Sequence, residues 1–161
     1  PEVKGLLGWA ENKAIATLNA EELGKLDLPK RLGILSQTTQ SRLQFAEFIS
    51  KVISTVFPGV KEIRIINTLC EETQKRQLAA MELARKSDVM IVVGGHNSAN
   101  TQRLAEVCSP IVETHLIETA AEIEMGWLVG KKCIGITAGA STPDEAIEEV
   151  VTKLKELTGS S

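Results

Sequence analysis

The chain has 161 residues, of which 43% are hydrophobic and 24% are charged, and its net charge at pH 7 is −3. This composition is typical of a globular protein with one domain or two small ones, and it excludes an intrinsically disordered chain. The acidic balance excludes a broadly basic surface for nucleic acid. Every apolar run is far shorter than the ~20 residues that a membrane-spanning helix needs.

Short apolar runs alternate with segments of helical periodicity along the whole chain. The runs that predict strands are residues 14–18, 31–36, 62–66, 88–93, 114–117 and 133–137. The segments that predict helices are residues 41–57, 71–86, 98–107, 119–128 and 142–157. Strands without polar alternation, each followed by a helix, indicate an α/β fold of parallel sheets flanked by helices.

Three predicted strand-to-helix loops are rich in small polar residues: 36–39 (SQTT), 94–100 (GGHNSAN) and 137–144 (TAGASTPD). In a parallel sheet such loops share one edge, where α/β folds bind ligands. Hydroxyl groups and backbone N–H groups at a helix N-terminus favour an anion. The same residue types cap helices and form turns, and capping is the favoured explanation for any single loop. Three such loops together favour a ligand, although none matches the P-loop or the dinucleotide-binding pattern.

The charges near these loops distinguish them. The helix expected after Ser98 has no acidic residue in its first two turns and carries Arg103, so on charge alone it is the better anion site. Residues 142–145 (TPDE) form a capping-box pattern with proline at the first helical position. The two acidic residues there would repel a phosphate.

The three cysteines are an odd number at wide spacing without a CxxC pair, which indicates a reducing compartment. Cys70 follows a predicted strand, where a cysteine is explained equally well as a thiolate ligand or nucleophile and as a small packing residue. Cys108, late in a predicted helix, and Cys133, inside a predicted strand, are expected to be buried packing residues. Glu2 and His96, each taken alone, are a solvated terminal acid and a surface-loop histidine.

Taken together, five segments resemble the LytB/IspH family of 4-hydroxy-3-methylbut-2-enyl diphosphate reductases. They are PEVKG at 1–5, SQTT at 36–39, Cys70 with QKRQ at 74–77, VVGGHNSANTQRLAE at 92–106 and GITAGASTPD at 135–144. The segments occur in the family's order and near its spacing, so the resemblance covers essentially the whole chain. The last two segments are the longest and most specific.

The resemblance implies a fold and a cofactor. The family's enzyme consists of three similar α/β units around a central [4Fe–4S] cluster held by three cysteines. Residues 1–66 would be an incomplete second unit and residues 67–161 the third, with the first unit absent. Only Cys70 falls on a cluster-ligand position, whereas Cys108 and Cys133 do not. The cluster is therefore expected in the full-length parent and not in this chain.

Site roles also follow from the resemblance, position by position. Cys70 would be a thiolate ligand of the cluster, Glu2 would supply protons, and Thr38 would position Glu2 or the hydroxyl of the substrate. Hydrogen bonds to the diphosphate would come from Ser98, Asn100 and Ser141. Ala99 stands where some family members have serine, which removes one donor side chain and leaves the backbone N–H.

The implied function is that of an oxidoreductase of isoprene biosynthesis in the non-mevalonate pathway. It removes the allylic hydroxyl of 4-hydroxy-3-methylbut-2-enyl diphosphate with two electrons and protons, giving isopentenyl and dimethylallyl diphosphate. The implied partners are this small-molecule diphosphate and an electron-donor protein such as a ferredoxin or flavodoxin, with no nucleic acid and no membrane. The implied location is the cytoplasm, or a plastid if an upstream transit peptide has been lost.

Two other interpretations stay open. One is a non-catalytic phosphate- or nucleotide-binding α/β module on the same scaffold. The other is a flavodoxin-like domain, which the strand pattern allows and the motifs do not favour. Upstream sequence with two more cysteines and a family-type N-terminal unit would decide for the enzyme. The chain alone is expected to be inactive, because only Cys70 matches a cluster ligand.

Overall fold

The computed structural model describes residues 2–11 and 13–159, and Pro1, which opens the PEVKG segment, lies outside the described residues. The chain forms two compact units, Pro1–Cys70 and Glu71–Ser161. The boundary expected from the sequence lies slightly earlier, between residues 66 and 67. That the units correspond to the second and third units of a larger enzyme stays a prediction. No helix in the described part of the chain is long and apolar enough to span a bilayer.

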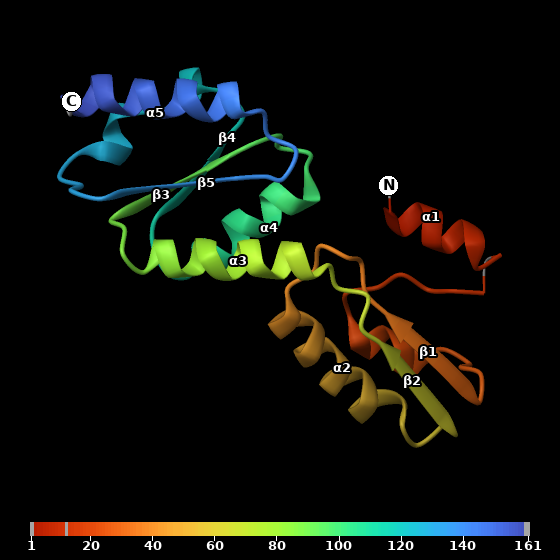
Figure 1. Ribbon diagram of the computed structural model, residues 1–161. Helices are drawn as coiled ribbons and strands as arrows, with labels where there is room; N and C mark the ends of the chain where they lie inside the picture. The colour runs from red at the N-terminus through yellow and green to blue at the C-terminus, as the bar shows by residue number, and fades with distance from the viewer. Residues whose placement is uncertain (1, 12, 160–161) are drawn as a thin grey trace. The chain divides into compact units, whose positions relative to one another are not determined.

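The first unit is built on a two-stranded parallel sheet (Figure 1). Its elements in chain order are α1 (Glu2–Trp9), the 3₁₀ turn η1 (Ala20–Lys25), β1 (Arg31–Leu35), α2 (Arg42–Val56) and β2 (Glu62–Ile66). The strands and the helix that the sequence predicts at 31–36, 41–57 and 62–66 are confirmed. Ser41 caps α2, because its hydroxyl accepts a hydrogen bond from the N–H of Gln44.

The core of this unit lies between α2, η1 and one face of the sheet. Val52 and Val56 of α2 are buried there against the strands and η1. Leu35 and Ile66 are paired across the two strands and lie on the other face, where both side chains are exposed. This face is therefore open to solvent at the ends of both strands.

Two sequence-based expectations fail in the first unit. Residues 14–18 form no strand, and the hydroxyl of Thr17 donates instead to the carbonyl of Asn19 at 3.2 Å, just before η1. An apolar run becomes a strand only beside a partner, and in the described structure β1 and β2 pair only with each other. The helix α1 was not expected, because Gly5 and Gly8 lower the helix propensity of this segment.

The second unit has a three-stranded parallel sheet in the order β4-β3-β5 between layers of helices (Figure 1). Its elements are α3 (Glu71–Ala84), β3 (Val89–Val93), α4 (Ala99–Cys108), β4 (Thr114–Ile117), the 3₁₀ turns η2 (Ala120–Glu122) and η3 (Met125–Leu128), β5 (Ile134–Ala138) and α5 (Asp144–Thr158). The central strand β3 is buried throughout, as its continuous apolar run predicts. α3 and α4 pack on one face of the sheet, and α5 and the 3₁₀ turns pack on the other. The expected parallel α/β fold is confirmed.

The helix expected over residues 119–128 is wrong, because this segment forms two separate 3₁₀ turns. Thr119 and Glu122 close η2 between them, and Ile123 after it has extended backbone angles. Leu128 at the end of η3 is buried in the core with α5. The apolar spacing of this segment suits a helix, but local capping and the burial of Leu128 fix two short turns instead.

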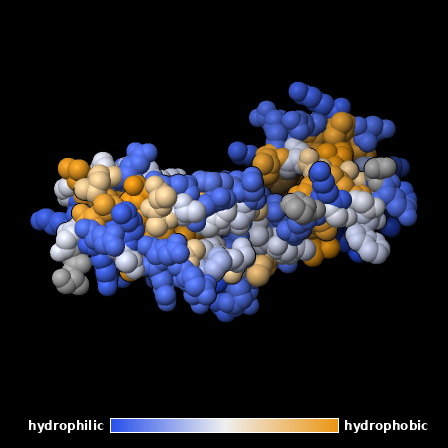
Figure 2. Space-filling view, turned by 90° about the horizontal axis from the view of Figure 1, so that it is seen from above, coloured by the Kyte–Doolittle hydropathy of each residue, from blue (hydrophilic) through white to orange (hydrophobic). Residues whose placement is uncertain are grey.

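The face shown in Figure 2 is mostly hydrophilic, with hydrophobic patches between the hydrophilic residues. The two tryptophans differ in their surroundings. Trp9 is 91% exposed, the most exposed large apolar side chain among the described residues. Trp127 packs against the core of the second unit, and its ring stacks on His115 with the centroids 3.9 Å apart and the planes 4° from parallel.

Candidate functional site

Two loops of the second unit meet at the carboxyl end of β3. One comprises residues 94–98 between β3 and α4, for which the sequence predicts an anion site, and is called the anion loop. The other comprises residues 139–143 between β5 and α5. The carbonyl of Val93, the last residue of β3, accepts hydrogen bonds at 3.0 Å from the N–H of Gly139 and from the hydroxyl of Thr142. The sequence-based expectation that these two loops share one edge of a sheet is confirmed. The expectation that all three polar loops share one edge is wrong, because residues 36–39 follow β1 in the separate two-stranded sheet.

Close approach between these loops requires glycine at two positions. Gly94 has φ +145°, a conformation that residues with a side chain rarely adopt, and a Cβ there would lie only 2.6 Å from Thr142 Oγ1. A Cβ at Gly139 would overlap Oγ1 of Thr101. The two loops therefore pack directly on the side chains of Thr101 and Thr142.

Ser98 caps the N-terminus of α4. Its hydroxyl oxygen accepts a hydrogen bond from the N–H of Thr101 at 3.4 Å. A hydroxyl that accepts at a cap still carries a hydrogen that it can donate to a ligand. Capping and anion binding are therefore compatible at Ser98. The first turn of α4 has no acidic residue, which leaves the positive end of the helix dipole uncompensated by a local carboxylate. Arg103 forms an ion pair with Glu106.

Asn100 and Thr101, in the first turn of α4, carry buried polar atoms without a partner. In the described part of the chain, Oδ1 and Nδ2 of Asn100 and Oγ1 of Thr101 are buried and make no hydrogen bond. Thr101 as a whole is only 1% exposed. An unsatisfied buried polar group costs about 1–3 kcal/mol. Such groups need an explanation, and a bound ligand or an ordered water would satisfy them.

Ser141 lies in the second loop and is exposed. The turn there is closed by the N–H of Thr142, which donates to the carbonyl of Gly139 at 3.0 Å. The capping box expected over residues 142–145 is wrong. The residue at the N-cap of α5 is Pro143, and no side chain caps this helix. The hydroxyl of Thr142 donates to the end of β3 instead, because the tertiary contact replaces the local one.

His96 is held at three points, which the sequence did not predict. Its N–H donates to Glu118 Oε1 at 2.6 Å, its Nε2 pairs with Glu122 Oε2 at 2.9 Å, and its carbonyl accepts from Gln102 Nε2 at 2.6 Å. The hydrogen bond with His96 is the main cause that lowers the pKa of Glu122. The histidine side chain is 53% exposed, as expected for a surface loop. The one sequence signal of this arrangement is the Thr119-x-x-Glu122 spacing of a capping box, which fixes the carboxylate that pairs with His96.

In the first unit, the structure brings together Glu2, Thr38 and Cys70. The backbone N–H of Thr38 donates to Glu2 Oε1 at 3.0 Å, and its hydroxyl donates to Glu2 Oε2 at 3.0 Å. The carbonyl of Thr38 accepts from the N–H of Cys70 at 2.9 Å. Nearby, the hydroxyl of Thr68 bonds both the N–H and the carbonyl of Ser36 and so ties the ends of β1 and β2 together. The Ser36–Thr68 pair was not predicted.

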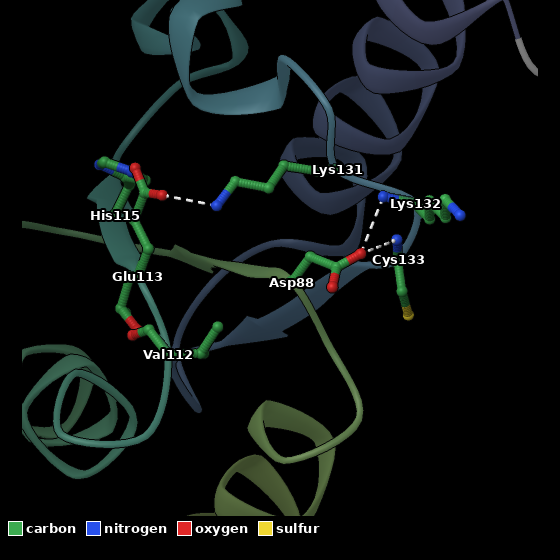
Figure 3. Close-up of polar contacts among 8 residues, drawn as sticks. Asp88, Val112, Glu113, His115, Lys131, Lys132 and Cys133 are labelled. Carbon is green, nitrogen blue, oxygen red and sulfur yellow. Dashed lines mark hydrogen bonds and ion pairs between the residues drawn. The ribbon is translucent and has the colours of Figure 1, made fainter.

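The three cysteines have different environments and form no disulfide. Cys70 is exposed. Cys108 is fully buried, as expected, and burial raises the pKa of its thiol to about 11. The expectation that Cys133 is buried inside a strand is wrong, because it is exposed and lies just before β5. The Asp88 carboxylate accepts hydrogen bonds from the N–H groups of Lys132 and Cys133 at 2.8 and 2.9 Å (Figure 3), and the N–H of Asp88 donates to the carbonyl of Cys133 at 2.8 Å.

Cys133 also lies at the amino ends of the strands, whereas the anion loop lies at their carboxyl ends. It precedes β5, next to Asp88 at the start of β3, whereas the anion loop follows the carboxyl end of β3. Lys131 in the same segment pairs with Glu113 at 2.8 Å (Figure 3). Within residues 2–11 and 13–159, no group of three or more histidine, cysteine, aspartate or glutamate side chains is placed to hold a metal ion.

The chain matches known proteins along nearly its whole length. The profile of the LytB protein family matches residues 1–155. Relatives named 4-hydroxy-3-methylbut-2-enyl diphosphate reductase include that of Dehalococcoides mccartyi, 49% identical over 159 residues, and that of Pelobacter propionicus, 46% identical over 158 residues. Both alignments cover 98% of this chain but only 56% and 55% of the relatives. The chain therefore spans about half the length of the curated relatives it matches.

Two solved structures are similar to this chain. One is described as (E)-4-hydroxy-3-methyl-but-2-enyl diphosphate reductase, the terminal enzyme of the non-mevalonate pathway. It is 41% identical, with a TM-score of 0.54 over 97% of this chain and 56% of its own. The E-1-hydroxy-2-methyl-but-2-enyl-4-diphosphate reductase of Plasmodium falciparum is 26% identical, with a TM-score of 0.82 over 95% of this chain and 48% of its own.

Proposed function

The chain belongs to the LytB family, and we propose that it supplies the diphosphate-binding and proton-delivering residues of a 4-hydroxy-3-methylbut-2-enyl diphosphate reductase. In this proposal the enzyme removes the allylic hydroxyl of its substrate as water, with two protons and two electrons, and the electrons come from a protein donor such as a ferredoxin or flavodoxin. The observation that carries the proposal is the group of buried, unpartnered polar atoms of Asn100 and Thr101 at the N-terminus of α4.

The diphosphate is held by neutral donors in this proposal. Ser98 and Asn100 lie at the start of α4, where the helix dipole favours negative charge and the first turn carries no acidic residue. The buried amide of Asn100 would donate through Nδ2 and gain the partner that it lacks. Ser141 adds a hydroxyl from the neighbouring loop. Neutral donors fix the geometry of the diphosphate group without neutralising its charge.

Glu2 delivers the proton in this proposal, and Thr38 positions it. The two hydrogen bonds from Thr38, one to each carboxylate oxygen, fix the plane of the carboxyl group. A fixed carboxylic acid beside the leaving hydroxyl can protonate the departing oxygen. This arrangement supports the positioning of Glu2, rather than of the substrate hydroxyl, as the role of Thr38.

The residues described here do not fit a whole [4Fe–4S] cluster held by three thiolates. The exposed thiol of Cys70 suits one ligand, and we propose that role for it. The thiol of Cys108 is buried and its pKa is raised to about 11, so it does not present a thiolate. Cys133 lies away from the loops at the carboxyl end of its sheet.

A titration with inorganic pyrophosphate tests the anion site. We expect the backbone amides of residues 98–100 and Ser141 to shift in an amide NMR spectrum of the ¹⁵N-labelled chain. Asn100→Ala should weaken binding roughly tenfold or more, since it removes a hydrogen bond to a charged group. Asn97→Ala is the matched control, because Asn97 is an exposed asparagine of the same loop.

Two results would contradict this proposal. Equal losses in Asn97→Ala and Asn100→Ala would show that the buried amide is not a ligand group. Tighter binding of a nucleotide such as ADP than of dimethylallyl diphosphate would favour a non-catalytic nucleotide-binding module instead of the reductase.

A further inference from the structure

We propose that Glu118 and Glu122, which follow β4, are positioning residues of the anion site and hold the anion loop in its binding conformation through His96. The inference rests on the proposed function, because it concerns the same anion site. Neither carboxylate belongs to a segment that carried the sequence resemblance. The structure connects them to the site through a short series of hydrogen bonds.

The first step concerns the backbone of the anion loop. Glu118 Oε1 accepts the N–H of His96 at 2.6 Å, and Gln102 Nε2 donates to the carbonyl of the same residue at 2.6 Å. Both peptide groups that flank the His96 side chain are thereby fixed. Gly95 passes close to the same carboxylate, since a Cβ there would lie 3.4 Å from Glu118 Oε1. Two residues further along the chain, Ser98 caps α4.

The second step concerns the side chain of His96. Its Nε2 pairs with Glu122 Oε2 at 2.9 Å. The other oxygen of that carboxylate, Oε1, accepts from the N–H of Glu118 at 3.0 Å, the N–H of Thr119 at 2.9 Å and the Thr119 hydroxyl at 3.2 Å. The carboxylate of Glu122 is therefore held by its own turn, and it presents Oε2 to His96 in a fixed place.

The third step is electrostatic. Carboxylates beside an anion site oppose anion binding through their charge. A site that used Glu118 only as a charge would bind an anion better without it. A site that uses Glu118 as a hydrogen-bond acceptor would bind worse without that acceptor. The two roles predict opposite signs for the same deletion, and this difference makes the inference testable.

The experiment compares two uncharged replacements of Glu118 in the whole chain. Glu118→Gln keeps an acceptor oxygen and loses the charge, whereas Glu118→Met loses both. The affinity of each variant for inorganic pyrophosphate is measured by calorimetry at fixed ionic strength. We expect Glu118→Gln to bind at least as tightly as the unchanged chain and Glu118→Met to bind about tenfold more weakly. The amide shifts of His96 and Ser98 should move in Glu118→Met and stay near their positions in Glu118→Gln.

Two further sets of variants keep the test decisive. Glu82→Gln and Glu82→Met are the matched control on an exposed residue of α3, and they should bind equally. Gln102→Met removes another hydrogen bond to His96 without any change of charge, and it should weaken binding by several-fold even if Glu118→Met fails to fold. Equal affinities of Glu118→Gln, Glu118→Met and Gln102→Met would overturn the inference alone. Absence of pyrophosphate binding by the unchanged chain would overturn the proposed anion site and this inference with it.

Discussion

Thr38 donates to both carboxylate oxygens of Glu2, from its backbone N–H and from its hydroxyl, each at 3.0 Å. The two residues are far apart in sequence, and the fold of the first unit brings them together. Because both oxygens are bound, the carboxyl group has one orientation. Each carboxyl oxygen of Glu2 accepts one of these hydrogen bonds and keeps a further lone pair, which can interact with a substrate or water.

The first prediction concerns proton delivery. In a complete enzyme that contains this chain, Glu2→Gln should keep substrate binding and lower kcat by ~10²–10⁴-fold, since the amide cannot supply the proton. The measurement is kcat and KM under saturating reductant. Glu47→Gln, at an exposed position of α2, is the control and should leave kcat unchanged. Near-normal turnover of Glu2→Gln would show that Glu2 does not deliver the proton.

The second prediction concerns the buried hydroxyl of Thr101. Thr101→Val keeps the shape of the side chain and removes an oxygen that has no partner, so the free energy of unfolding should rise by about 1 kcal/mol. Thr142→Val is the matched control, because the Thr142 hydroxyl does donate to the carbonyl of Val93. It should lower the free energy of unfolding by about 1 kcal/mol. Urea unfolding measures both, and a loss of stability in Thr101→Val would contradict the prediction.

The third prediction concerns acid stability. Hydrogen bonds from the N–H groups of Lys132 and then Cys133 lower the pKa of Asp88 below its ordinary value. A lowered pKa in the folded state stabilises the fold above the pKa of the unfolded chain, about 3.9, and this stabilisation is lost as the pH falls through the folded value. In Asp88→Asn the melting temperature should therefore fall less steeply below about pH 4 than in the unchanged chain.

Other acidic groups contribute to the same acid transition. The pKa of Glu113 is lowered by its hydrogen bonds with Lys131 and then His115, so part of the pH dependence should remain in Asp88→Asn. Asp27→Asn, at an exposed position of the first unit, is the control. If both variants follow the curve of the unchanged chain, the contact of Asp88 with the segment before β5 contributes nothing to acid stability.

The fourth prediction concerns thiol reactivity. Iodoacetamide at about pH 8 should alkylate Cys70 and Cys133, which are exposed, and leave Cys108 unmodified. The thiol of Cys108 is buried and its pKa is about 11, so it offers almost no thiolate at that pH. Mass spectrometry of the modified peptides identifies each site. Alkylation of Cys108 in the folded chain would show that α4 opens readily.

The fifth prediction concerns the cluster. Anaerobic reconstitution of this chain with iron and sulfide should leave it colourless, because Cys70 is the one cysteine for which we propose a cluster-ligand role, and a cubane cluster needs more thiolates than one. Iron and acid-labile sulfide are measured after gel filtration. A brown protein with about four irons per chain, as a cubane cluster requires, would overturn the assignment of Cys108 and Cys133 as non-ligands.

The sequence predicted those elements whose signal is local and strong. The apolar run of β3 is buried in full, and α2 begins at the serine cap and ends near the Pro58-Gly59 pair. The loops at the carboxyl edge of the second sheet follow from the parallel strand order. Their residues could be named in advance because parallel connections leave little choice of edge.

Several of the failures have a common cause, which is contact, or the lack of contact, between residues distant in sequence. Cys133 was expected inside the strand, but it precedes β5, and its N–H donates to the carboxylate of the distant Asp88. The three hydrogen-bonded contacts of His96 were not predicted. Glu118 and Glu122 follow β4, and the pairing of β4 with β3 is what brings them beside His96. Residues 14–18 have strand-like composition without a neighbouring strand in the described structure.

Because Trp9 and Trp127 lie in different environments, tryptophan fluorescence reports the unfolding of the two units unequally. Trp9 is already in water, so its emission changes little when the first unit unfolds. Trp127 loses its stacking on His115 and its packing in the core when the second unit unfolds. A melting curve followed by intrinsic fluorescence therefore records the second unit almost alone, and a difference between that curve and one followed by circular dichroism measures how independently the first unit melts.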